Sequence, residues 1–163
     1  MGVAISMNRF LAISCVILNS LILSFSSPIA AQQNSYYCES ALAVKQRLEQ
    51  KYNLKVAYAN GWNISKYYFE RPPSNRNIEY VYQLDGSGAE SVFNSPVLLK
   101  SIAKEVIQGC NSVGIVGFGT FRGGRDQVPG KYFGLLSDGR IELFPCDFSS
   151  KERTHWGKRW CYD

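Results

Sequence analysis

The sequence predicts an α+β domain in which two helices pack on one face of a mostly antiparallel sheet of about four or five strands. Two stretches repeat apolar residues with the period of a helix, and shorter stretches read as strands. Their order is helix, strand, strand, helix and then three strands, which we expect to form a C-terminal three-stranded meander. Cysteines in the same region add two predicted disulfides.

The first helix is expected at 39–52, because its apolar residues fall on one broad face and its charged residues lie mostly opposite. A first strand follows at 54–59, and the turn pair Asn60-Gly61 is expected to end it. The next segment is ambiguous. Its residues 67–69 suit a strand, whereas 71–75 must form a loop because it contains two consecutive prolines.

The second helix is the clearest element of the sequence. Ser95 is a residue type that caps helices, Pro96 suits the first helical position, and Gly109 is a typical stop. An alternating strand at 77–84 precedes this helix, and a strand-like stretch at 113–121 follows it. The three elements could form one strand–helix–strand unit with a right-handed crossover.

The last two strands are expected at 131–137 and 140–144. The pair Asp138-Gly139 between them is a strong hairpin turn. These strands complete the single domain, since the sequence contains no internal repeat and no low-complexity segment.

Residues 1–31 differ in composition from the rest of the chain. Arg9 is their only charged side chain, 10–25 is an apolar run, and small residues follow at Ala30 and Ala31. This order is typical of an export signal, so we expect a signal peptide that is cleaved after Ala31 or one residue earlier. The remainder, 32–163, would then be a secreted or periplasmic domain with no stable membrane anchor. A retained membrane helix is the alternative, for which the apolar run is short.

Four cysteines remain beyond the signal, an even number that predicts two disulfides in an oxidising compartment. A zinc site is not expected, because the sequence has no C-x-x-C pair and a single histidine. Three pairings are possible. We favour Cys38 with Cys110, which joins the two helices, and Cys146 with Cys161, which holds the C-terminal segment.

The net charge is +5 at pH 7 and falls by one, to +4, when Arg9 leaves with the signal. This mild excess lacks the dense Lys/Arg loading of a nucleic-acid binder. Gly114, Gly117 and Gly119 do not form a dinucleotide fingerprint, because no helix follows to present its N-terminus to a phosphate. In a strand, such glycines more often admit a packed helix or an aromatic ring. We therefore expect no cofactor.

Two segments contain candidate binding residues. Arg122 and Arg125 lie in a glycine-rich loop, and arginine offers a planar donor fork for a carboxylate or phosphate. The alternative is a solvated hairpin loop in which Asp126 pairs with one of the arginines.

The C-terminal segment combines aromatic and basic residues at Trp156, Lys158, Arg159 and Trp160. This combination suits anionic polymers such as acidic glycans, teichoic-type chains or single-stranded nucleic acid. The alternative is that both indole rings pack on the sheet, where Cys161 holds them.

Catalytic patterns are weak. His155 is the only imidazole, and the sequence contains no G-x-S-x-G nucleophile motif, so we expect no catalytic triad. Glu70, Glu79, Glu142 and Asp147 could supply the paired carboxylates of a glycosidase, but their spacing predicts no cleft.

These observations predict an exported, non-catalytic domain that binds a protein or an anionic polymer. The alternative is a small secreted hydrolase that acts on cell-wall or extracellular carbohydrate through paired carboxylates. A hydrolase would contain a cleft with two facing carboxylates, whereas a binding domain would present an exposed aromatic and basic surface.

Overall fold

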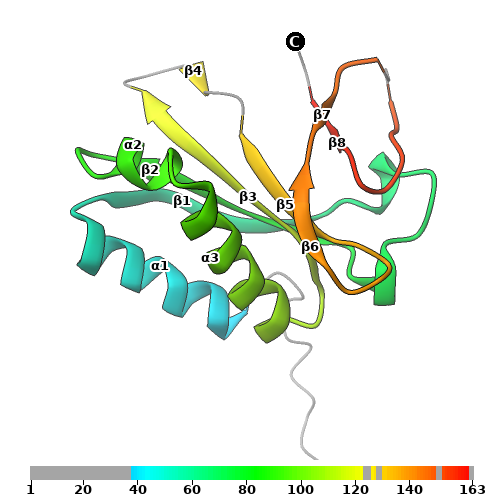
Figure 1. Ribbon diagram of the computed structural model, residues 1–163, viewed down its shortest axis with the longest axis horizontal. Coiled ribbons are helices and arrows are strands. Elements are labelled where there is room, and N and C mark those ends of the chain that lie inside the picture. The colour runs from blue at the N-terminus through cyan, green and yellow to red at the C-terminus, as the bar shows by residue number, and fades with distance from the viewer. Residues whose placement is uncertain (1–37, 123–125, 128–129, 150–151, 162–163) are drawn as a thin grey trace, which may run out of the picture. The chain divides into compact units, whose positions relative to one another are not determined.

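A computed structural model describes residues 38–122, 126–127, 130–149 and 152–161. Within these residues the fold is α+β, with three helices, one mostly antiparallel main sheet and a small parallel sheet (Figure 1). The five strands of the main sheet, in spatial order, are β1 (Lys55–Asn63), β2 (Ile78–Asp85), β3 (Val113–Arg122), β5 (Lys131–Leu135) and β6 (Ile141–Phe144). The short strand β4 (Asp126–Gln127) pairs with the end of β3.

The two long helices, α1 (Glu39–Tyr52) and α3 (Pro96–Gly109), have the bounds that the sequence predicts. Asn53 ends α1 in the left-handed conformation, with φ 48°. Ser95 is the N-cap residue of α3, but its side chain makes no capping hydrogen bond, so that part of the prediction is wrong. Helix α2 (Ala89–Phe93) is not predicted from the sequence, because five residues are too few to show a helical period.

In the main sheet, β2 and β3 are parallel, with α3 between them in the chain, and the other neighbouring strands are antiparallel. Strand β1 does not end at Asn60-Gly61 but continues to Asn63. Gly61 lies opposite Tyr80, and a Cβ atom on it would come within 2.9 Å of the Ile78 side chain. This glycine therefore admits side chains of β2 and does not form a turn.

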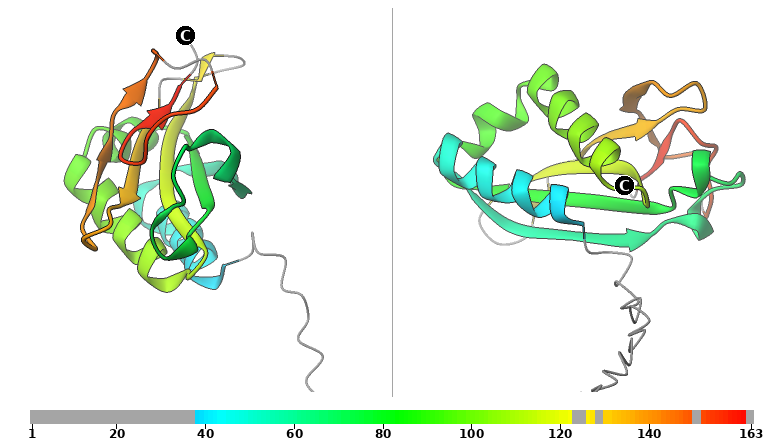
Figure 2. Two further views of the ribbon diagram at one scale, coloured as in Figure 1. Left: turned by 90° about the vertical axis from the view of Figure 1, so that its right-hand side faces the viewer. Right: turned by 90° about the horizontal axis from the view of Figure 1, so that it is seen from below.

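Helices α1 and α3 contact each other and lie over the same face of the main sheet (Figures 1 and 2). Tyr82 of β2 is fully buried beneath them, and its hydroxyl donates a hydrogen bond of 2.8 Å to the carbonyl of Ala41 in α1. The remaining core on this face is apolar, and its helical members are Ala41, Val44, Leu48, Leu99, Ile102, Ala103, Val106 and Ile107.

The opposite face is covered by short elements. They are the 3-10 turn η1 (Ser65–Tyr67) and the two-residue parallel strands β7 (Cys146–Asp147) and β8 (Arg159–Trp160). A second 3-10 turn, η2 (Pro73–Asn75), lies in the predicted loop. The ambiguous residues 67–69 do not form a full strand, and Tyr68 makes a single bridge to Thr154.

Both disulfide pairings predicted from the sequence are confirmed. The Cα atoms of Cys38 and Cys110 are 5.8 Å apart, and those of Cys146 and Cys161 are 5.4 Å apart. Two disulfides are consistent with an oxidising, extracellular environment. Across the described residues, no helix combines the length and the hydropathy that a membrane span requires.

Candidate functional site

Arg159, a predicted binding residue, lies inside the domain. Its guanidinium forms an ion pair with Glu79 of β2, with Nε 2.6 Å from Oε2, and its Nη2 donates a hydrogen bond of 3.1 Å to Oε1. The exposed fraction is 11% for the Arg159 side chain and zero for Glu79. Burial raises the pKa of Glu79 to about 7, although the neighbouring guanidinium opposes this shift. Arg159 therefore holds the C-terminal segment to the sheet and adds no exposed charge.

Tyr132 of β5 lies next to this ion pair. The Arg159 guanidinium is 5.1 Å from the centre of the Tyr132 ring. The ring also lies against Gly117, where a Cβ atom would come within 2.8 Å of it. The interpretation that a strand glycine admits an aromatic ring is therefore confirmed at Gly117.

Trp156 also has a structural role. Its ring packs on Tyr68 and Phe144, with ring centres 4.8 and 5.5 Å away. Its indole N–H donates a hydrogen bond of 2.7 Å to the carbonyl of Leu135 at the end of β5. Trp156 therefore packs on the sheet, as the alternative interpretation of the sequence predicts.

Trp160 is partly exposed and stacks on Tyr67. The two ring centres are 5.3 Å apart and the rings are inclined by 17°. The ammonium group of Lys66 is 4.9 Å from the centre of the Tyr67 ring, and Lys158 is exposed. Two predicted residues, Lys158 and Trp160, therefore remain at the surface, where Lys66 and Tyr67 join them.

A second aromatic pair follows along the same segment. Phe69 is 60% exposed, and its ring centre is 5.1 Å from that of His155. The imidazole Nδ1 contacts the carboxylate of Glu70, and this hydrogen bond lowers the pKa of that carboxyl. The contact between the His155 imidazole and the Glu70 carboxylate therefore links the two segments and places the Phe69 and His155 rings side by side.

Tyr67 and Phe69 flank the buried Tyr68, which has an extended backbone with φ −121° and ψ 145°. The rings of Tyr67, Trp160, Phe69 and His155 lie along the contact between these two segments, and we call them the aromatic row. Phe69 and His155 are exposed, whereas Tyr67 and Trp160 are partly buried and Tyr67 also packs on the core. Sequence reasoning predicted only Trp160 of the aromatic row as a binding residue and missed Tyr67, Phe69 and His155, because their pairing depends on the bridge between Tyr68 and Thr154.

The arginine loop falls largely outside the described residues. Arg125 and the side chain of Arg122 are outside the described residues. The backbone of Arg122 ends β3, five residues beyond Gly117, which corresponds to about 16 Å along a strand. The binding role expected for Arg122 and Arg125 therefore remains a prediction.

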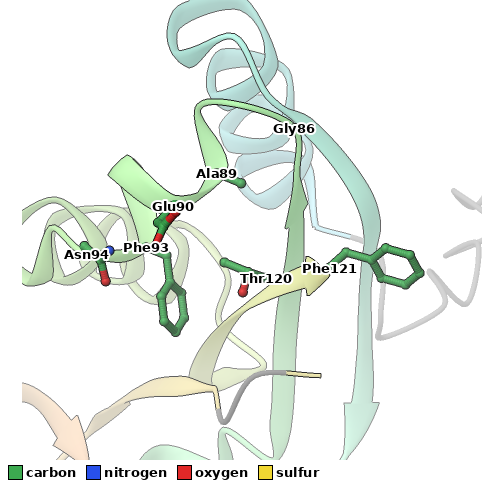
Figure 3. Close-up of a pocket in the computed structure, with 7 residues that line it drawn as sticks. All are labelled: Gly86, Ala89, Glu90, Phe93, Asn94, Thr120 and Phe121. Atoms are coloured by element: carbon green, nitrogen blue, oxygen red, sulfur yellow. The ribbon is translucent and has the colours of Figure 1, made fainter. Parts of the chain in front are cut away.

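A cavity of about 280 Å³ adjoins this end of β3 (Figure 3). Thr120 and Phe93 face it, whereas the ring of Phe121 points away. Lys131 covers the Phe93 ring, with its ammonium group 4.6 Å from the ring centre, and donates a hydrogen bond of 2.8 Å to the Phe93 carbonyl.

Lys131 also borders a larger and mostly apolar groove, of about 450 Å³, between α3 and the strands β5 and β6. We call it the α3–β6 groove. Its lining residues are Pro96, Val97, Lys100, Lys131, Phe133, Glu142 and Leu143.

The four carboxylates considered for catalysis each have a partner among the described residues. Glu70 contacts His155, Glu79 contacts Arg159, and Glu142 forms an ion pair of 2.8 Å with Lys100. Asp147 accepts hydrogen bonds from Ser149 and Thr154. Within the described ranges, no group of three His, Cys, Asp or Glu side chains could hold a metal ion.

Comparison with known proteins adds no assignment to this geometry. No protein-family model, no curated protein and no solved structure matches the chain.

Proposed function

We propose that this protein is an exported, non-catalytic domain that binds an acidic polysaccharide through the aromatic row. The observation that carries the proposal is the row itself, in which two aromatic pairs follow one another along the contact between two short segments, with Phe69 and His155 exposed. Phe69 exposes 60% of its surface, so that its ring is accessible to a ligand.

The spacing of the row suits a polymer. Tyr67 pairs with Trp160 and Phe69 pairs with His155 along the contact between the same two segments, so that successive units of one ligand can contact successive ring pairs. An aromatic face is flat and apolar, and a sugar ring presents a similar face of C–H groups.

The charge around the row favours an anionic ligand. Lys66, Arg71, Arg153 and Lys158 are exposed in the two segments that form the row, against the acids Glu70 and Glu152. A local excess of base attracts a polyanion. The excess is small, which favours an acidic polysaccharide over nucleic acid, because nucleic-acid surfaces are densely basic.

The test is a binding titration with polygalacturonate as the acidic polysaccharide, neutral dextran and single-stranded oligo-dT. We expect polygalacturonate to bind best, with an affinity that falls steeply as salt rises over a roughly sixfold range, from about 50 to 300 mM. Equal binding of dextran would remove the role of charge. A preference for oligo-dT would assign the surface to nucleic acid and contradict the proposal.

Two variants address the row directly. Phe69→Ala should weaken polygalacturonate binding about tenfold, as expected for one stacking ring, with little loss of stability because the ring is exposed. Lys158→Ala should reduce the salt dependence. Phe121→Ala and Lys104→Ala are the matched controls, since both side chains are exposed on other elements. If Phe69→Ala binds like the wild type, the aromatic row is not the binding surface.

A further inference from the structure

We infer that the α3–β6 groove is a second binding surface and that its occupant is an extended peptide segment of a partner protein. The segment would add to β6 as a further strand and place one large apolar side chain, flanked by acidic residues, in the groove. This inference uses a different part of the molecule and does not depend on the aromatic row.

The groove has an apolar floor and an apolar rim. Phe133 of β5 is 3% exposed and forms part of the core, whereas Val97 of α3 is 80% exposed and Leu143 of β6 is 53% exposed. Phe133 and Leu143 are paired in register, so their side chains lie on the same face of the sheet. Two exposed aliphatic side chains beside a buried ring form the kind of concave apolar site into which a partner inserts a side chain.

Strand β6 is the last strand in the order of the main sheet. Among the described strands it pairs with β5 alone, so that its outer edge presents backbone N–H and C=O groups. An extended segment that pairs with this edge lies beside the first turn of α3. Every second side chain of that segment then points toward the groove.

Charge selects the occupant. The charged side chains that line the groove are Lys100, Lys131 and Glu142. Glu142 is already paired with Lys100, whereas Lys131 contacts only the ring and carbonyl of Phe93 among the interactions of the described residues. The groove thus carries a net positive charge on a chain of net charge +5. An acidic segment complements it, whereas a second copy of this chain would add like charge.

The experiment selects peptides from a random library displayed on phage, using the purified protein with both disulfides formed and counter-selection on Val97→Asp. We expect the selected peptides to combine a large apolar residue with neighbouring acidic residues. Val97→Asp is suitable because this side chain is exposed and an acid in the first turn of a helix favours the helix.

Fluorescence anisotropy then measures the best peptide against single variants. Val97→Asp and Leu143→Asp should each weaken binding at least tenfold, whereas Tyr58→Asp, at an exposed position on the opposite edge strand β1, should not. A peptide methylated on alternate backbone nitrogens should lose binding in one of its two registers, because strand pairing uses every second N–H group.

Three results would overturn the inference. Selection of basic peptides would exclude the charge argument. Selection of peptides that bind Val97→Asp as well as the wild type would exclude the groove as the binding site. Methylation in both registers without effect would exclude strand addition. A dimer in sedimentation velocity that Val97→Asp abolishes would assign the groove to a second copy. The peptide experiments are independent of polygalacturonate binding at Phe69, so the two proposals can fail separately.

Discussion

One face of the main sheet is covered by two helices of fourteen residues, whereas the segments that cover the other face contain no regular element longer than three residues among those described. The core beneath the helices is apolar apart from the hydroxyls of its tyrosines. The core beneath the irregular segments contains a buried ion pair, Glu79 with Arg159, and a cluster of aromatic rings.

The difference follows from how each cover satisfies its own backbone. A helix makes its backbone hydrogen bonds internally and can bury a purely apolar stripe. An irregular segment needs individual partners. The Tyr68 hydroxyl donates to the carbonyl of Lys158, the Trp156 indole donates to that of Leu135, and the amide of Phe69 donates to that of Thr154. Polar and aromatic side chains therefore concentrate on the second face, which is also where the aromatic row lies.

The largest effect is expected from breaking the buried ion pair. At a pH above the raised pKa of Glu79, Arg159→Met leaves its carboxylate buried without a countercharge, which typically costs about 3–5 kcal/mol of unfolding free energy. Chemical denaturation followed by fluorescence measures this loss. Lys158→Met is the matched control, because this neighbouring side chain is exposed, and it should change stability by less than about 0.5 kcal/mol.

A double variant sharpens the result. Glu79→Leu combined with Arg159→Met removes both charges and should be clearly more stable than Arg159→Met alone, since the cost of a lone buried charge disappears. Equal stability of the single and double variants would mean that the ion pair does not connect the C-terminal segment to the sheet.

The second effect concerns the disulfide on the irregular face. Replacing Cys146 and Cys161 by Ala opens a loop with a sequence separation of 15, worth about 3 kcal/mol in the chain-entropy model. Hydrogen exchange should then rise in 152–161, whereas α1 and α3 should keep their protection. Uniformly faster exchange across both helices would show that the two faces unfold as one unit.

The same contrast explains what the sequence can reveal. Helices α1 and α3 are predictable to within a residue, because an apolar stripe and a residue that favours helix termination mark each of them; Gly109 is the last residue of α3, and Cys110 follows as its C-cap. The pairing of Cys38 with Cys110 agrees with the expected positions of the helix ends, although four cysteines alone allow three pairings. Arg159 resembles a surface charge in the sequence, because its partner Glu79 is 80 residues away and an alternating strand does not show which of its outer positions are covered.

Most of the aromatic row is not visible in the sequence for a related reason. Trp160 and Lys158 stand out by residue type, but Tyr67 and Phe69 lie in a segment that contains a 3-10 turn and a single bridge, which has no sequence period. Long-range pairing of irregular segments is set by particular contacts. Neither helical nor strand periodicity encodes such contacts.

The smallest effect, and the most specific to the irregular face, is a pH dependence centred on Asp147. Hydrogen bonds from the Ser149 hydroxyl and then from the buried Thr154 hydroxyl lower the pKa of this carboxyl to about 2, from an ordinary value of 3.8. A carboxyl whose pKa is lower in the folded state stabilises the protein at a pH above that ordinary value. This contribution is lost as the pH falls through about 2.

Thr154→Val removes one of these donors while keeping the shape of the side chain. The pKa of Asp147 should then rise toward its ordinary value, so that the variant is less stable than the wild type at neutral pH and the difference shrinks as the carboxyl is protonated. Urea denaturation from about pH 2 to pH 7 measures both curves. Thr154→Ser keeps the hydroxyl and should follow the wild-type curve in shape. A difference between wild type and Thr154→Val that is constant across this range would show that the buried hydroxyl acts through packing alone, and that the Thr154–Asp147 bond does not tune the acid stability of the irregular face.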